Sequence, residues 1–223
     1  EQAPHERLRD ARAAMYRGLI LDTAEEVFAE HGHDAASMKA IASRAGVSLA
    51  TLYAHFGSKG ALFEGVHARR LGDLMRVALR RAGGGDALDR PLSALAWHTA
   101  FHYAHPHYLR MHLHAGVAWA QAEALRTAVQ REAWTAGQAA MAAAFADGTR
   151  DGIFADDDPR RMACAATTLT QVALASWVEG GMTEPLPALL RWQGEQLVRS
   201  FVVVERIAEL LPRVEATLTV VVE

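Results

Sequence analysis

Apolar residues recur every three or four positions along most of the chain. In residues 15–32, Ile20, Ala24, Val27 and Phe28 fall on one stripe, while glutamates occupy the other face. This spacing predicts an amphipathic helix, because an α-helix completes a turn in about 3.6 residues. Similar patterns predict further helices at residues 38–42, 49–55, 59–82, 91–105, 108–114, 119–146, 159–180 and 188–210. We therefore expect an all-α fold.

Capping residues and glycines separate these helices. Ser37, Ser48 and Ser58 each precede a predicted helix, where a serine hydroxyl can accept a free amide N–H. Three consecutive glycines at residues 83–85 form the clearest break in the chain. The tail alternates like a strand without a visible partner, so we expect it to be poorly ordered. The expected parts are an N-terminal three-helix helix-turn-helix domain at 1–60, with a flexible arm at 1–14, a larger helical domain at 61–212 and the tail at 213–223.

Composition narrows the class of protein. Hydrophobic residues make up 51% of the 223 residues and charged residues 22%, which is typical of a globular rather than a disordered chain. The single cysteine, Cys164, excludes an internal disulfide framework. No uncharged apolar run approaches the roughly 20 residues of a membrane helix, and residues 1–10 are too polar for a secretory signal. We therefore expect a cytoplasmic protein with no membrane partner.

The net charge of −3 is unevenly distributed. Residues 1–81 contain twelve basic and ten acidic residues, whereas the remaining residues contain eleven and sixteen. The small excess of basic residues in 1–81 permits an anionic partner at the N-terminal end of the chain.

Residues 37–56 carry the most informative pattern. Two short helices, each preceded by a serine, are joined by a turn that contains Gly46, which is the layout of a helix-turn-helix motif. In DNA-binding versions of this motif, the second helix enters the major groove. The candidate DNA contacts, all able to donate hydrogen bonds, are Lys39, Ser48, Thr51, Tyr53, His55 and Lys59. The same geometry also occurs in proteins that bind no DNA, so the spacing alone leaves both interpretations open.

A series of residues in fixed order extends this motif on both sides. It comprises Ala24, Phe28, Gly32, Ser37-Met38, Ile41-Ala42, Ala45-Gly46-Val47-Ser48, Leu52-Tyr53, His55-Phe56, Ser58-Lys59 and Leu62-Phe63. Over about residues 17–66, without a gap, this series closely resembles the N-terminal domain of the TetR family of bacterial transcriptional regulators.

The resemblance implies a recognition helix at residues 48–55, phosphate contacts by Tyr53, His55 and Lys59, and a contact of Lys39 with the DNA backbone or groove. It further implies a homodimer that reads a near-palindromic double-stranded DNA operator, and a repressor that a small molecule releases. The residues at the family's buried positions are Ile41, Val47, Leu52 and Phe56. The dimer's four-helix bundle would be formed by residues 158–180 and 188–210.

The chain departs from the family's pattern at two positions. Ala50 stands where a glycine is common, so its methyl group can contact a thymine methyl or is simply tolerated. Gly60 stands where an acidic residue is common, which weakens the start of the next helix slightly. Four arginines precede the domain and form either an arm that reaches the DNA or a solvated, frayed terminus: Arg7, Arg9, Arg12 and Arg17.

The resemblance also implies a small-molecule effector that binds in the larger helical domain at 61–212, but the sequence does not identify this molecule. Apolar and aromatic side chains with a few polar groups line such pockets. The candidate ligand-binding residues, each of which fits an ordinary core position equally well, are Trp97, Phe101, His102, Met111, Trp119, Trp134, Phe145 and Trp177.

Six of the eleven histidines fall within residues 98–114, which raises the alternative of a metal or haem sensor with the same fold. His98 and His102 have the four-residue spacing that can chelate a transition metal. No carboxylate lies within this segment and Cys164 is distant, so we expect neither a metal nor a cofactor.

A third alternative is a helical small-molecule-binding protein that has lost DNA binding. No phosphate loop, nucleophile elbow or zinc-protease motif is present, so we expect no enzyme activity.

Overall fold

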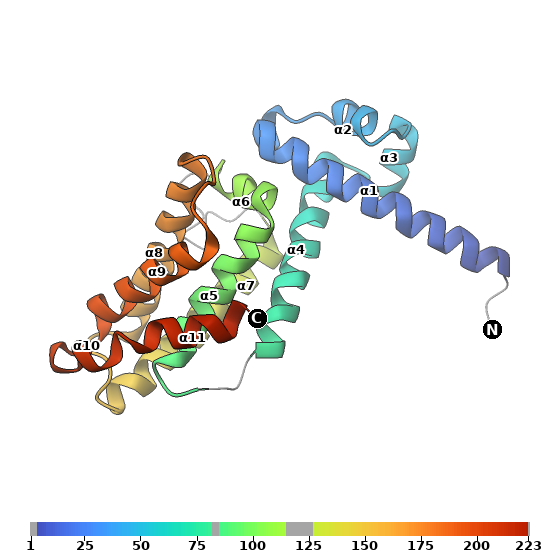
Figure 1. Cartoon of the computed structure of the whole chain (residues 1–223). Helices are drawn as coiled ribbons and strands as arrows, with labels where there is room; N and C mark the ends of the chain where they lie inside the picture. The colour runs from blue at the N-terminus through green and yellow to red at the C-terminus, as the bar shows by residue number, and fades with distance from the viewer. Residues whose placement is uncertain (1–3, 82–84, 115–126, 223) are drawn as a thin grey trace. The chain divides into compact units, whose positions relative to one another are not determined.

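The computed structural model describes residues 4–81, 85–114 and 127–222, and helices dominate these ranges (Figure 1). The helices are α1 (Pro4–Ala35), α2 (Met38–Arg44), α3 (Leu49–His55), α4 (Lys59–Arg81), α5 (Asp89–Ala104), α6 (Pro106–Leu113), α7 (Ala128–Arg150), α8 (Pro159–Glu179), α9 (Leu186–Phe201), α10 (Val204–Leu210) and α11 (Arg213–Val222). The expected all-α fold is confirmed. No helix in the described ranges is both long enough and apolar enough to cross a membrane.

The helices form two compact units. The first contains the described residues up to Arg70 together with α6 from His107 onward, and the second contains the rest. The first unit thus extends past residue 60, where the sequence placed a domain boundary, and α4 contributes to both units. α6 is anchored within the first unit because its buried Tyr108 hydroxyl lies 3.1 Å from Nδ1 of His67 on α4.

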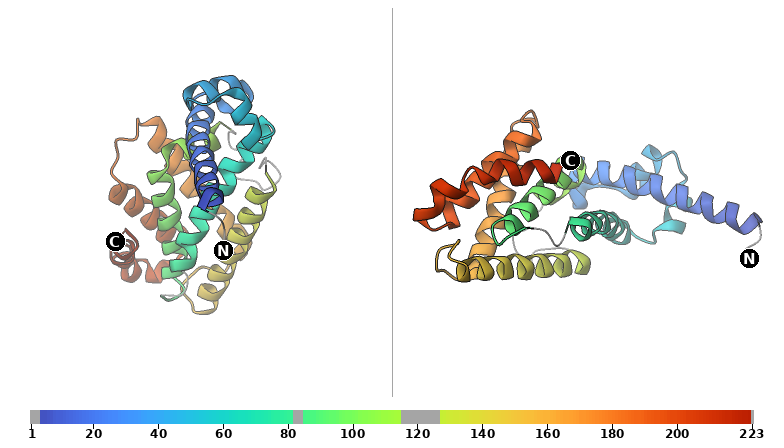
Figure 2. Two further views of the ribbon diagram at one scale, coloured as in Figure 1. Left: turned by 90° about the vertical axis from the view of Figure 1, so that its right-hand side faces the viewer. Right: turned by 60° about the horizontal axis from the view of Figure 1, so that its bottom comes forward.

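The N-terminal segment is helical, which corrects the expectation of a flexible arm at residues 1–14. α1 begins at Pro4, and proline suits the first turn of a helix because its missing N–H would have no partner there. Arginine, leucine and alanine, which favour helices, fill much of the segment that follows. Residues 5–17 are exposed, and this part of α1 projects beyond α2 and α3 (Figure 2). The regular helix breaks at Gly32, with φ 73°, as the sequence predicted.

The tail is also helical rather than poorly ordered. Val214 and Leu218 of α11 are buried at the four-residue spacing of one helix face. A Cβ atom at Gly194 of α9 would lie 2.5 Å from Cγ1 of Val214, so glycine at this position lets α11 approach closely. Arg213 adds ion pairs to Asp86 at 2.8 Å and Asp89 at 3.1 Å. Docking against other helices therefore orders a segment whose own pattern looked strand-like.

The single helix expected at residues 188–210 is interrupted. α9 ends at Phe201, and Val202 is extended with ψ 142°, which fits the low helix propensity of consecutive β-branched valines. The extended segment pairs with residues after α7: the N–H of Ala155 donates to the carbonyl of Phe201 at 2.8 Å, and the N–H of Val203 donates to the carbonyl of Ile153 at 3.0 Å.

The helix expected at residues 119–146 is seen only in part, because residues 115–126 lie outside the described ranges. α7 starts after Thr127, whose hydroxyl accepts from the N–H of Gln130 at 3.2 Å while the Gln130 side chain accepts from the N–H of Thr127 at 3.1 Å. This reciprocal capping box satisfies two amide groups at the helix start.

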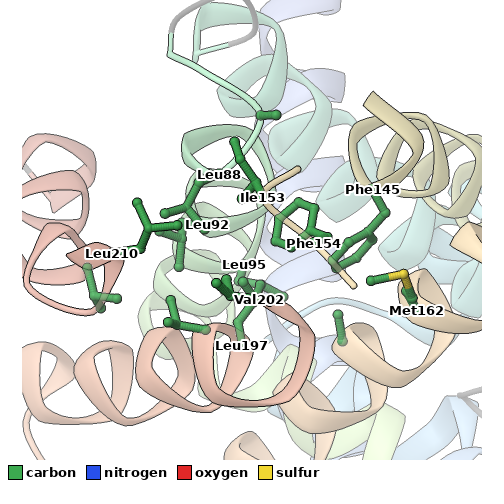
Figure 3. Packing of buried hydrophobic residues seen from close by; sticks show 14 of the residues in the cluster. Leu88, Leu92, Leu95, Phe145, Ile153, Phe154, Met162, Leu197, Val202 and Leu210 are labelled. Carbon is green, nitrogen blue, oxygen red and sulfur yellow. The ribbon is translucent and has the colours of Figure 1, made fainter. Parts of the chain in front are cut away.

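A hydrophobic core holds the second unit together (Figure 3). Phe145 of α7 and Phe154 belong to this core, with ring centroids 4.8 Å apart. The labelled members of the cluster are Leu88, Leu92, Leu95, Phe145, Ile153, Phe154, Met162, Leu197, Val202 and Leu210. Buried Gly148 of α7 lies against the Phe154 ring, where a Cβ atom would overlap ring carbons.

We predict opposite effects for two glycine-to-alanine substitutions in α7. Gly148→Ala should lower the free energy of unfolding by about 1–3 kcal/mol, because the new methyl group overpacks the core against Phe154. Gly137→Ala should raise it by about 0.5–1 kcal/mol, because nothing lies within 4 Å of the added Cβ and alanine favours the helix. Urea unfolding of both variants measures the difference. Equal effects would contradict this packing.

Candidate nucleic-acid interface

The motif formed by α2 and α3 is held by serine caps. The Ser37 hydroxyl accepts from the N–H of Ala40 at 3.1 Å, and the Ser48 hydroxyl accepts from the N–H of Thr51 at 3.0 Å. Gly46 in the turn has φ 65°, a conformation that glycine adopts without steric cost. Both caps and the glycine turn therefore occupy the positions that the sequence predicted.

One face of the motif is buried. Ile41 and Leu52 are fully enclosed and Phe56 is nearly so, as expected, whereas Val47 is only half-buried. The Arg17 guanidinium of α1 lies 4.5 Å from the centroid of the Phe56 ring, a cation–π arrangement. These contacts fix the orientation of α3 against α1.

The opposite face of α3 is open to solvent. Tyr53 is 47% exposed and Leu49 is 41% exposed. Ser48 at the start of α3 and Lys39 on α2 are also exposed. Sequence analysis did not single out Leu49, because a leucine in an amphipathic helix is ordinarily assigned to the core.

The two ends of α3 are more constrained. Thr51 is half-buried, and its Oγ1 lies 2.8 Å from Oγ of Ser48, so both predicted contacts take part in the cap. His55 is half-buried, and its ring centroid lies 6.4 Å from that of Tyr16 on α1. Tyr16 is 39% exposed and was not identified from the sequence, because no local signal relates it to α3.

Lys59 connects the start of α4 to the backbone between α1 and α2. Its ammonium group donates to the carbonyls of Asp34 and Ala36, at 3.0 Å each. A cation in the first turn of a helix is opposed by the helix dipole, but backbone carbonyls at the end of α1 lack helical partners. Lys59 thus joins the start of α4 to the link between α1 and α2, in addition to the Ser58 hydroxyl that caps α4 through the N–H of Ala61.

The predicted ligand-binding residues belong to both units. Phe145 belongs to the hydrophobic core and Met111 to the first unit, while Trp119 lies outside the described residues. Trp134 is half-buried on α7, and Trp97 packs partly buried against the core.

The remaining three lie on α5 and α8. Phe101 and His102 are buried on α5, with ring centroids 5.5 Å apart. Trp177 of α8 stacks on Tyr103 of α5 at 4.6 Å, and its indole N–H donates to the carbonyl of Glu184 at 3.0 Å. Trp177 is therefore packed inside the second unit.

A buried polar group lies between α5 and α9. The Thr99 hydroxyl donates to Oε1 of Gln193 at 2.7 Å, while Nε2 of Gln193 is buried and has no acceptor within the described ranges. Nδ1 of His102 lies 3.0 Å from the carbonyl of His98. Burial lowers the pKa of His102 to about 4 and that of His98 well below its usual value, so both rings are neutral near pH 7.

The histidines of residues 98–114 are divided between the two units. His98 and His102 are neighbours, with ring centroids 4.4 Å apart. His112 packs against Tyr108 in the first unit, and Nε2 of His114 lies 2.9 Å from the carbonyl of Ala29. Across the described residues, no group of three or more His, Cys, Asp or Glu side chains is arranged to hold a metal ion. The cluster that prompted the metal-sensor alternative thus forms no common ligand set there.

Comparison with known proteins supports the interpretation of the motif. Residues 20–66 match the model of the tetR family of bacterial regulatory proteins. The HTH-type transcriptional repressor SCO4008 of Streptomyces coelicolor is 30% identical over 170 residues, which cover 76% of this chain and 80% of that protein. The HTH-type transcriptional activator FasR of Mycolicibacterium smegmatis is 48% identical over 67 residues, which cover 29% of this chain and only 31% of that protein.

Solved structures share the fold. A TetR-like transcriptional regulator from Rhodococcus sp. RHA1 matches with a TM-score of 0.68 at 22% identity, covering 83% of this chain and 95% of that one. The regulator FadR from Bacillus subtilis, in complex with stearoyl-CoA, matches with a TM-score of 0.60 at 20% identity, covering 81% and 96%. Together with the match to most of SCO4008, these findings show that the chain belongs to the TetR family of bacterial transcriptional regulators, whose members are transcription factors and not enzymes.

Proposed function

We propose that this protein is a cytoplasmic, ligand-responsive repressor that binds a near-palindromic DNA operator as a homodimer. The observation that carries the proposal is the exposed face of the capped motif formed by α2 and α3, in a chain of the TetR family. The relative that matches over most of its length, SCO4008, is named a repressor, and this supports repression over activation. The match to the activator FasR covers only 29% of this chain.

In this proposal α3 enters the major groove. Tyr53 and Lys39 are the leading contacts to the backbone, because their side chains are exposed. Ser48, Thr51 and His55 contact DNA from the ends of α3. We propose that Lys59 contributes mainly by holding α3 in place, and not through the phosphate contact that the resemblance implied.

The proposed dimer interface is the outer face of α8 and α9. Small and apolar residues are exposed on α8 at four-residue spacing: Cys164, Thr168, Val172 and Ser176. On the adjacent α9, Trp192 is 43% exposed in a shallow groove lined also by Pro185, Pro187, Ala188, Arg191 and Glu195. Exposed tryptophans of this kind often dominate the stability of an interface, and a two-fold axis would bury each copy against its equivalent.

The proposed effector is an organic molecule with a hydrogen-bond acceptor, bound in the second unit. The buried Nε2 of Gln193 supports an acceptor, because it lacks one within the described ranges. His102, three residues after Thr99 on α5, is neutral near pH 7 and thus offers no positive charge to an anionic group there. Such a ligand releases DNA only if it binds the DNA-free conformation more tightly than the DNA-bound one.

Fluorescence anisotropy tests the proposed function directly. The labelled DNA comes from the flanks of the protein's own gene, and each fragment is titrated over a salt series. We expect tight binding to one fragment, far tighter than to scrambled DNA, that weakens steeply with salt. A second experiment selects duplexes from a random library. Equal, weak binding to all fragments, together with no enriched sequence in this selection, would favour the alternative of a helical small-molecule-binding protein that has lost DNA binding.

We predict that Tyr53→Ala weakens operator binding about tenfold to a hundredfold, because a hydrogen bond to a charged phosphate contributes about 1.5–3 kcal/mol. The side chain is half exposed, so the melting temperature should hardly change. Tyr53→Phe separates the hydroxyl from the ring. Ala136→Ser on the exposed face of α7 is the control. Unchanged affinity of Tyr53→Ala would show that this residue is not a DNA contact.

The two lysines of the chain should behave differently when replaced by methionine. Lys59→Met should lower the free energy of unfolding by about 1–3 kcal/mol, because it removes two hydrogen bonds from a charged group. Its binding should weaken without a change in salt dependence. Lys39→Met should leave stability unchanged and reduce the slope of log affinity against log salt by about 0.9 for each lost phosphate contact. A reduced slope and normal stability for Lys59→Met would contradict the structural role.

Trp192→Glu should convert the dimer into a monomer, because a charge would be buried against its equivalent. Operator affinity should then fall, since each recognition helix binds its half-site alone. Ala136→Glu, which adds the same charge to an exposed position of α7, is the matched control. Light scattering during size-exclusion chromatography measures the mass of each variant. A Trp192→Glu protein that remains dimeric would exclude this face.

A further inference from the structure

The first turns of α1 form an exposed helix with a basic excess. Residues 5–17 are all exposed, and they contain four arginines but only two acidic residues, Glu6 and Asp10. This part of α1 projects beyond α2 and α3 in the views of Figure 1 and Figure 2. Burial therefore does not explain why these residues are helical.

The basic residues are arranged by the helix. His5, Arg9, Arg12 and Tyr16 follow one another at intervals of four, three and four residues, so they lie on a single narrow face. Neither Glu6 nor Asp10 belongs to that face, although Oδ1 of Asp10 lies 4.0 Å from Nε of Arg9. Both partners of this pair are exposed, so it competes weakly with another anion.

This face leads to the recognition helix. Tyr16 is its last member, and the Tyr16 ring lies 6.4 Å from that of His55, the last residue of α3. The next residue, Arg17, lies over Phe56, which fixes α1 against the end of α3. A continuous line of hydrogen-bond donors thus runs from α3 along α1 for eleven residues, or about 17 Å at the rise of an α-helix.

We propose that His5, Arg9, Arg12 and Tyr16 form a helical arm that binds the phosphate backbone of DNA beyond the sequence read by α3. The inference rests on the proposed function, because it extends the DNA-binding surface of α3. The partner is double-stranded DNA next to each half-site, bound through phosphates and without base specificity. About 17 Å of duplex carries on the order of ten phosphate charges, at one per 1.7 Å of axis, so two arginines on this face have several phosphates within reach.

A protein partner is the competing occupant, because Leu8, Met15 and Leu19 are exposed on a neighbouring face of the same helix. Charge complementarity and direct continuity with α3 favour DNA. The arginine face ends beside His55, the last residue of the recognition helix.

The test uses the full-length chain and duplexes that it enriches from a random 30-bp library. Two probes carry the same enriched site, one with about 2 bp and one with about 10 bp of flanking DNA on each side. The variant is Arg9→Gln with Arg12→Gln, and the matched control is Arg7→Gln, on the opposite side of the same helix. Circular dichroism confirms that the helix content of the variants is unchanged.

We expect the unaltered protein and Arg7→Gln to bind the long probe more tightly than the short one. The double variant should lose this preference and should bind the short probe normally. Its salt slope on the long probe should fall by about 0.9 for each lost phosphate contact, and thus by up to about 3.6 in a dimer that loses four.

Two outcomes would contradict the proposed arm without contradicting the proposed function. The first is an equal salt slope for all proteins on the long probe. The second is unchanged DNA binding by the double variant together with loss of a higher-order complex, which would indicate a protein partner. The failure of the proposed function is distinguishable, because the unaltered protein would then enrich no sequence and bind both probes no better than scrambled DNA.

Discussion

Seven residues are too few to sustain an α-helix in water, because the first turn must be fixed before its hydrogen bonds compensate the lost entropy. α2 and α3 both have this length, so they depend on how their ends are satisfied. Ser37 and Ser48 accept amide hydrogens at the two starts, and Lys59 bonds the carbonyls just before α2. Buried Leu52 supplies the apolar anchor behind α3. The exposure of Tyr53 at a defined position follows from these contacts, so the DNA-binding surface is a consequence of helix capping.

The same contacts divide α3 into a rigid part and an adaptable part. The Ser48 hydroxyl is already engaged by the N–H of Thr51 and lies next to the Thr51 hydroxyl, so both side chains are held before DNA arrives. Ordering them on binding costs little entropy. Tyr53 is half exposed and retains rotational freedom, which suits contact with a phosphate whose position varies with the shape of the duplex. We infer that the start of α3 fixes the register of the proposed complex, while its middle accommodates differences between half-sites.

Local signals in the sequence were sufficient to predict the two capped helices of the first unit and the turn between them. Ser37, Ser48 and Gly46 act within a few residues of where they stand, so their roles can be read from the sequence. Local signals do not reveal contacts between residues that are distant in the sequence. The partners of Lys59 lie 25 and 23 residues away, and the docking of Val214 depends on a glycine in another helix. The ligand-binding residues stay a prediction for a related reason: large aromatic side chains serve the core and a pocket equally well, and only packing distinguishes them.

The second unit buries polar groups that lower its free energy of unfolding. Thr99 and Gln193 are buried side by side, and the Nε2 donor of Gln193 lacks an acceptor within the described ranges. Such a donor costs about 1–3 kcal/mol. One turn further along α9, Leu197 fills a buried position with an apolar side chain, so the helix itself does not require the amide. An unsatisfied donor that gains an acceptor from a ligand stabilises the bound state selectively. A small molecule shifts a regulator between two conformations only if such a hydrogen bond forms more favourably in one of them than in the other. The unsatisfied donor would make hydrogen bonding, more than size or apolarity, the basis on which the proposed effector is selected.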